Sequence, residues 1–203
     1  MKSIIFFLLI LSSYIFSRTP KTFITEKQFR KRISNHYILK FLRTRNCCLN
    51  LKEKRYIIQT ANRFKINPML ILGKMQGESS VIDGGRDKRK YKYMAMGIEK
   101  KWAYGFYRQV WYACKTLDYH FRNAHTKKFK VYVYDLGKKI KLNRAAYALF
   151  KYCPWWYAKP APYEFYCGNR IFYWIFRKYN RKIKKIIKKN SLKNWEGTLL
   201  AKK

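Results

Sequence analysis

The chain has 203 residues, which suits one domain, and its 47 Lys and Arg against 10 Asp and Glu give a formal net charge of +37. Hydrophobic residues make up 48% and aromatic residues 19%, so the chain can bury a core, which excludes wholesale disorder despite the charge. Nine Gly and five Pro exclude collagen-like and Gly/Pro-rich low-complexity chains. The charge indicates an anionic partner: nucleic acid, lipid headgroups or an acidic polymer such as cell wall.

The first 17 residues have the pattern of an export signal. Lys2 precedes an apolar stretch over residues 4–16, and the small residue Ser17 follows. The stretch is shorter than the roughly 20 residues that a membrane-spanning helix needs. The pattern favours a signal peptide over residues 1–17 that is cleaved after Ser17, and the alternative is an uncleaved N-terminal anchor. We therefore expect an exported protein of the periplasm or cell envelope, tethered by residues 4–16 if the segment is kept.

Helical periodicity dominates the first half of the remaining chain. Thr25 and Gln28 have the spacing of a capping box, which predicts a helix start, and apolar residues at helical spacing continue this helix to Phe41. After a turn over residues 46–50, a second helix is predicted from Glu53 onward. Asn67-Pro68 is a strong start signal for a third helix, which should end near Ser79 or Ser80.

The second half alternates loops and helices. Residues 83–93 are polar and predict an exposed loop, and residues 104–124 predict a long helix. Residues 129–135 alternate as a single strand would, and residues 142–152 predict a helix that Pro154 ends. A Pro- and Trp-rich loop precedes a last helix from about residue 171 to 189. We expect an all-α, or mainly α, fold of about six helices with two working loops.

The five cysteines show no metal or redox motif, because no pair has the two-residue spacing of zinc or thioredoxin-type sites. In an oxidising compartment, Cys153 and Cys167 could close the Pro-rich loop as a disulfide, and buried free thiols are the equal alternative. The three histidines form no metal pattern either. We expect no metal and no cofactor.

The ten carboxylates are few enough to consider singly, and Glu78 differs from the rest. It is predicted at the C-terminal end of a helix, on the apolar face of Ile71 and Met75. Burial and the negative helix end both favour its protonated form, which is what a general acid needs near neutral pH. Gly77 leaves room for a substrate. The alternative is a surface Glu at a fraying helix end. Asp118, by contrast, has Lys115 near it, and we interpret it as solvated.

Several blocks around Glu78 resemble one protein family. Residues 67–72 and 75–80 resemble the catalytic-helix motif of the lysozyme-like lytic transglycosylases, in which an apolar helix ends in Glu-Ser. Ala95-Met96-Gly97 is similar to the family segment that lines the cleft, and residues 145–154 and 167–174 resemble the blocks that follow. The blocks occur in order over residues 50–178. Phe150 stands where the family often has a Tyr, so Tyr152 or Tyr147 is a candidate replacement.

The resemblance implies a lysozyme-like helical domain with a catalytic cleft over residues 50–178, an N-terminal helical extension over 18–49 and a basic tail over 179–203. It implies a peptidoglycan lytic transglycosylase, in which Glu78 protonates the glycosidic oxygen between N-acetylmuramic acid and N-acetylglucosamine. The sugar's own 6-hydroxyl then attacks and leaves a 1,6-anhydro end. The substrate-binding candidates are Ser79, Met96, Gly97, Gln109, Tyr152 and Trp155.

Two alternatives remain open. A goose-type inverting lysozyme would use Glu78 with Asp83 or Asp87 as a second carboxylate. A protein of another class would bind nucleic acid or a membrane surface through its basic residues, although no nucleic-acid motif is present and a specific nucleic-acid partner is not expected. Eight of the thirteen residues 177–189 are Lys or Arg around an isoleucine stripe, which suits an anionic membrane or wall surface, or a helix end that only keeps the protein soluble.

Overall fold

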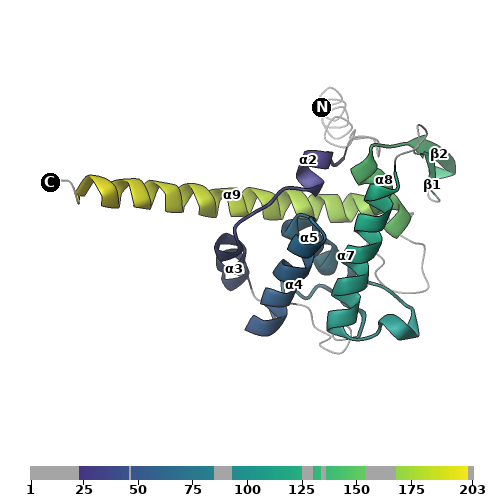
Figure 1. Cartoon of the computed structure of the whole chain (residues 1–203), viewed down its shortest axis with the longest axis horizontal. Helices are drawn as coiled ribbons and strands as arrows, with labels where there is room; N and C mark the ends of the chain where they lie inside the picture. Colours follow the sequence, from purple (N-terminus) through teal and green to yellow (C-terminus); the bar gives the residue numbers. More distant parts are fainter. Residues whose placement is uncertain are drawn as a thin grey trace, which may run out of the picture.

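The computed structural model describes residues 23–45, 47–84, 93–124, 130–133, 136–153 and 168–200, with side chains in the last helix described as far as residue 192. This part of the chain is mostly helical, which confirms the predicted mainly α fold (Figure 1). Its elements in chain order are α2 (Glu26–Phe29), α3 (Asn35–Arg43), α4 (Leu51–Arg63), α5 (Pro68–Ser79), the 3-10 turn η2 (Lys101–Ala103), α7 (Phe106–Arg122), β1 (Lys130–Val133), β2 (Lys138–Lys141), α8 (Arg144–Tyr152) and α9 (Asn169–Leu200).

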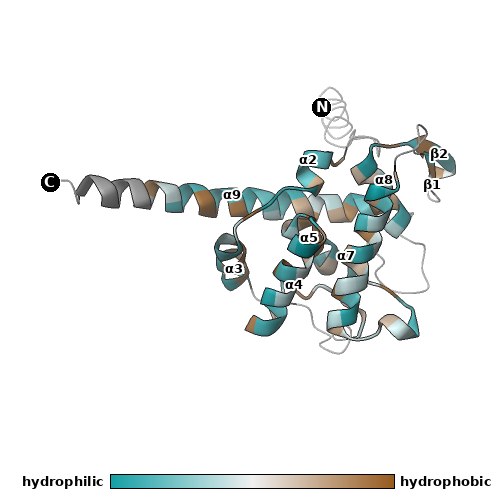
Figure 2. Ribbon diagram, viewed as in Figure 1, coloured by the Kyte–Doolittle hydropathy of each residue, from teal (hydrophilic) through white to brown (hydrophobic). Residues whose placement is uncertain are grey.

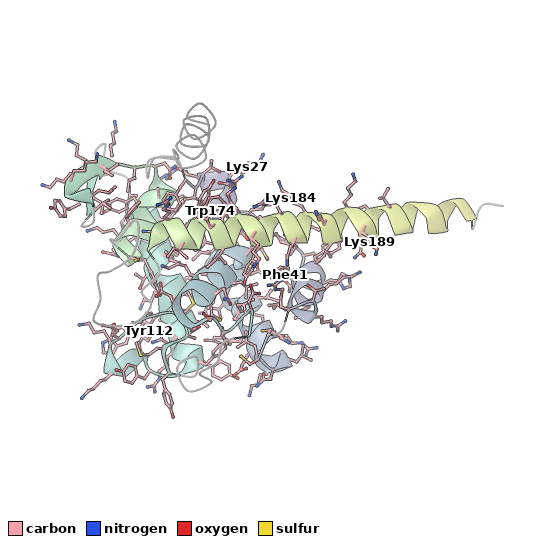
Figure 3. All side chains as sticks on the ribbon, turned by 180° about the vertical axis from the view of Figure 1, so that it is seen from behind. Lys27, Phe41, Tyr112, Trp174, Lys184 and Lys189 are labelled. Carbon is pink, nitrogen blue, oxygen red and sulfur yellow. The ribbon has the colours of Figure 1, made fainter. Side chains whose placement is uncertain are left out.

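The long helix α9 organises the packing. It lies across α5 and α3, and α4 packs on both α5 and α7, while α8 packs along α7 (Figure 1). Gly73 lies where α5 meets α9, and a Cβ at this position would make ordinary van der Waals contact with the Phe172 ring at 3.4 Å. The C-terminal turns of α9 project away from the other helices (Figure 1). Figure 3 places Lys184 and Lys189 along α9 toward this projecting end.

The predicted caps are confirmed, but the first predicted helix is divided in two. The hydroxyl of Thr25 accepts from the Gln28 amide, yet α2 ends at Phe29 and α3 begins at Asn35. Asn67 is the reason. Its side-chain amide donates to the Gln28 carbonyl (2.9 Å) and its backbone N–H donates to the Phe29 carbonyl (2.7 Å), so a tertiary partner takes carbonyls that a continued helix would have used.

The single predicted strand is one half of a hairpin. β1 pairs antiparallel with β2, and Val131 lies opposite Ile140. The sequence did not indicate β2, because Ile140 is the one apolar residue among three lysines. Gly137, just before β2, has a φ of 57°, a conformation that glycine adopts at low cost.

One core includes both flanking regions that the sequence separated from the central domain. Phe23, Ile24 and Phe41 from the predicted extension are buried in it, and so are Tyr179 and Ile183 from the predicted tail. Phe41 and Tyr179 meet edge to face at 5.0 Å between ring centroids. The residues described before position 50 therefore pack into the same body as those that follow.

The isoleucine stripe of α9 faces the protein. Ile183 is 1% exposed, and Ile186 and Ile187 are partly buried against the core. Lys40 of α3 also donates to the Asn190 side chain at 2.6 Å. Figure 2 shows hydrophobic residues recurring among hydrophilic ones along α9. The stripe is thus at least partly covered by the chain's own helices, and the exposed residues of α9 from 177 to 189 are Lys and Arg.

Among the described helices, none combines the length and the apolar character needed to cross a membrane. Residues 4–16 lie outside the described residues.

Candidate functional site

Glu78 lies one residue before the end of α5, as predicted, and is 7% exposed. Asn67 begins this helix by accepting from the Met69 amide, with Pro68 in the first turn. Ser80 ends it in the left-handed conformation (φ 56°). The cap and the turn together fix how far α5 extends, and so place the carboxylate where the helix meets the segment that follows.

A buried lysine pairs with this carboxylate. The Lys74 ammonium donates to Glu78 Oε1 at 2.8 Å, four residues back on the same helix, and the Lys74 side chain is 0% exposed. The ammonium also lies 5.1 Å from the centroid of the Tyr152 ring and 5.7 Å from that of Phe172. Glu78 therefore belongs to a buried ion pair, of which the sequence analysis identified only the carboxylate.

Gly97 lies directly against the other carboxylate oxygen. A Cβ at this position would lie 2.7 Å from Glu78 Oε2, closer than real Cβ contacts occur, and the φ of Gly97 is 73°. Both the space and the backbone conformation therefore require glycine. The Ser79 hydroxyl donates to the Met75 carbonyl (2.8 Å) and lies 3.1 Å from the Ala95 carbonyl, which links the end of α5 to the same segment.

Gln109 of α7 holds the 96–98 segment in place. Its side-chain oxygen accepts from the amides of Met96 (3.1 Å) and Ile98 (3.2 Å). Its side-chain nitrogen donates to the carbonyls of Ile98 (2.7 Å) and Ala103 (3.1 Å). Gln109 was predicted to bind substrate, but it is 0% exposed, and its side chain forms these hydrogen bonds with backbone groups instead. The Met96 side chain is also fully buried, and it is the backbone of Met96 that faces these partners.

Tyr152, at the end of α8, completes the cluster. Its hydroxyl donates to the Met96 carbonyl, and its ring lies beside the Lys74 ammonium. Burial first, and then the negative charge of Glu78, raise the pKa of the Tyr152 hydroxyl well above its ordinary value, so the hydroxyl remains a donor. Of the two candidate tyrosines, Tyr152 is therefore the one beside Glu78. Tyr147 packs near His120, and Phe150 is buried against Phe23.

Asp83 is committed to ion pairs. Arg45 and Lys178 both bind its carboxylate, the latter at 3.4 Å, and so join the segment after α5 to α9 and to the end of α3. Burial alone would raise the pKa of Asp83, but its hydrogen bond to Arg45 and the charges of Arg45 and Lys178 outweigh this and lower the pKa. Asp83 therefore acts as a structural anion.

Of the remaining predicted positions, one is corrected by the structure and three are not described by it. The prediction that Asp118 is solvated is wrong: it is 7% exposed, and Arg30 binds it at 2.8 Å. Trp155, Asp87 and Cys167, the partner in the proposed disulfide, lie outside the described residues.

Within the described ranges, no group of three or more His, Cys, Asp or Glu side chains is arranged to hold a metal ion. The polar groups assembled here are one carboxylate, one ammonium and one phenol, with the backbone of residues 95–98. This set can move a proton at Glu78 and stabilise a negative charge there.

Comparisons of the chain with models of protein families, with curated proteins and with solved structures found no match.

Proposed function

We propose that the protein is a peptidoglycan lytic transglycosylase with Glu78 as its general acid and base. The observation that supports this is the convergence of three separated segments on one carboxylate. The end of α5, residues 95–97 and the end of α8 each resemble a transglycosylase block, and each contacts Glu78 or the residues around it. Sequence blocks that are similar only by chance have no physical reason to meet at the proposed acid.

The reaction needs one protein carboxylate. Glu78 delivers its proton to the glycosidic oxygen between N-acetylmuramic acid and N-acetylglucosamine, and the bond from that oxygen to the muramic acid C1 breaks. The 6-hydroxyl of the same muramic acid bonds to C1 and returns its proton to Glu78. No water is consumed. The Lys74 ammonium, 2.8 Å from Oε1, stabilises the carboxylate in the interval when its proton is on the sugar.

The first step requires a protonated Glu78. A bound glycan would exclude water from the site. The proposed glycan cleft borders the exposed edge of Glu78 and the 95–98 segment. Asp83, held by Arg45 and Lys178, is poorly suited to be a second catalytic carboxylate, which favours transglycosylation over the goose-type reaction with Asp83.

The basic surface and the proposed export belong to the same proposal. Peptide stems and lactyl groups of the wall carry carboxylates, so a chain of net charge +37 would be attracted to the polymer it cleaves. This attraction should weaken as salt is added. The location would be the periplasm or cell envelope.

The test is digestion of purified sacculi by the wild-type protein and by Glu78→Gln, Glu78→Asp and Glu99→Gln variants, with products read by mass spectrometry. We expect 1,6-anhydro ends from the wild type and from Glu99→Gln, an exposed carboxylate that serves as the matched control. Glu78→Gln should be inactive. Glu78→Asp keeps the charge but withdraws the proton donor by one methylene, so its activity should fall sharply.

A folding measurement accompanies each variant, because Glu78→Gln leaves the buried Lys74 ammonium facing a neutral amide. The Glu78→Asp variant keeps an anion near Lys74 and serves as the better-folded comparison. Full wall lysis by folded Glu78→Gln would remove the proposal, and reducing ends in place of anhydro ends would replace it with a hydrolase.

A further inference from the structure

A cavity lies at the opposite end of α5 from Glu78. The cavity, of about 680 Å³, opens where α2, α4 and α7 end, and Lys65 on its wall is three residues before the start of α5. The rise of an α-helix places the two ends of α5 about 15 Å apart along its axis, so this cavity is separate from the proposed acid. Its lining residues are Arg30, Arg32, Arg63, Lys65 and Arg122, with Phe64 and Asp118.

The lining is cationic beyond what the composition predicts. Five of the seven lining residues are Arg or Lys, whereas 47 of the 203 residues in the chain are. Asp118 is the one carboxylate among the seven. It is already bound by Arg30 at 2.8 Å and by Arg122 at 2.9 Å. The cavity therefore has an excess of four positive charges on its wall.

Arg30 makes one side of this wall rigid. Its guanidinium donates to the carbonyls of Phe64 (2.7 Å) and Lys65 (3.1 Å) as well as to Asp118, and lies 4.1 Å from the centroid of the Phe121 ring. These bonds hold the turn after α4, in which Lys65 has a φ of 53°. The cations near this turn are thus presented on a fixed backbone and need little ordering when a ligand binds.

The charges of three of these cations are not neutralised by a described carboxylate. Arg32, Arg63 and Lys65 are exposed, and none of them pairs with a carboxylate in the part of the chain that the structure describes. They bring like charges to one cavity, which repel one another until an anion enters. A ligand that supplied several negative charges at once would relieve this repulsion and accept hydrogen bonds from the guanidinium groups.

The size and charge of the cavity define the ligand chemistry. Its volume falls in the range of small-molecule sites, roughly 300–1,000 Å³. A terminal phosphate carries about −1.5 to −2 near pH 7 and several strong acceptor oxygens, so two or three linked phosphates match the excess charge in a compact volume. A chain of single carboxylates would need a longer ligand. We propose that this cavity binds an oligophosphate of two or three linked phosphate groups, either free or as the headgroup of a lipid.

The test measures binding of inorganic tripolyphosphate to the full chain by calorimetry in about 0.15 M salt, where diffuse surface attraction is screened. The pocket variant is Arg32→Ala with Arg63→Ala, which removes two charges and breaks no described ion pair. The matched control is Arg43→Ala with Arg181→Ala, two exposed arginines on α3 and α9. We expect one saturable site in the wild type and the control, and binding about 30-fold weaker in the pocket variant.

A second arm identifies the source of the phosphates. Phosphatidylcholine vesicles with and without a prenyl diphosphate are mixed with the same three proteins. Binding to the diphosphate vesicles that is lost in the pocket variant supports a lipid headgroup, and binding of tripolyphosphate alone supports a free anion. Either result supports an oligophosphate site.

Two results would overturn the proposal. Equal weakening in the pocket and control variants would mean that net charge alone attracts the anion. A site that ignores tripolyphosphate, yet binds a single-stranded oligonucleotide less well in the pocket variant, would be a nucleic-acid interface instead. Thermal melts of both double variants, expected to match the wild type, exclude misfolding as the cause.

Discussion

Replacing Lys74 with Met would remove the ammonium beside Glu78 and keep the apolar part of the side chain in its place between Tyr152 and Phe172. At 2.8 Å and an effective dielectric constant of about 20, the attraction between the two charges amounts to about 6 kcal/mol. The cost of burying both ions offsets much of this in the wild type. Once Lys74 is gone, a buried carboxylate remains without its partner, so we expect the free energy of unfolding to fall by about 4 kcal/mol.

The decisive comparison is the double variant Lys74→Met with Glu78→Gln. Neither side chain is then charged, so the double variant should be more stable than the sum of the two single losses implies, by about 2 kcal/mol or more. Urea denaturation of the four proteins, followed by far-ultraviolet circular dichroism, gives the coupling directly. Losses that add to within about 0.5 kcal/mol would show that the two groups do not stabilise one another, and the proposed role of Lys74 would fail with them.

Three further predictions follow from single contacts. Gly97→Ala should lower the free energy of unfolding by about 2 kcal/mol or more and reduce wall lysis, because its methyl group meets Glu78 Oε2 at a strained backbone position; an unchanged melt and activity would contradict this. Gln109→Leu should cost about 3 kcal/mol or more in urea denaturation, since buried amides and carbonyls of the 96–98 segment lose their partners, whereas a cost near zero would mean that water replaces them. Asp83→Asn tests the pH dependence of stability. The pKa of Asp83 is lowered below the ordinary 3.8, so its ion pairs stabilise the fold above that pH and stop doing so as the pH falls through the pKa of the folded state. In thermal melts below about pH 4 the wild type should therefore lose its higher stability relative to Asp83→Asn, and a stability difference that stays constant with pH would refute this.

Local signals were sufficient for most of the helices. Asn50 and Glu53 form a second capping box at the start of α4, and Asn67-Pro68 begins α5, because a cap depends on residues within one turn of each other. The break between α2 and α3 could not be predicted, since it depends on hydrogen bonds from Asn67, almost forty residues away. β2 was missed for a related reason: its pairing with β1 stabilises a lysine-rich segment that has little strand character alone.

In the candidate site, too, local signals predicted some residues, whereas others depend on contacts between distant segments. The position of Glu78 followed from the length of one helix and the apolar face it shares. Lys74 was overlooked, although its spacing of four residues on that same face was a signal available in the sequence. The role of Gln109 depends on a turn that α7 meets only in three dimensions. Tyr152 could be separated from Tyr147 only once the end of α8 was placed beside Met96.

Acidic side chains are used almost entirely for internal contacts. The structure describes the side chains of six carboxylates, and five of them bind a cation or a helix cap; these five are Glu26, Glu53, Glu78, Asp83 and Asp118. Of these six, Glu99 alone is exposed. Two copies that approach each other in dilute buffer therefore meet like charge from nearly every direction. Colloidal repulsion should keep the protein dispersed at low ionic strength, and added salt should bring its molecules together.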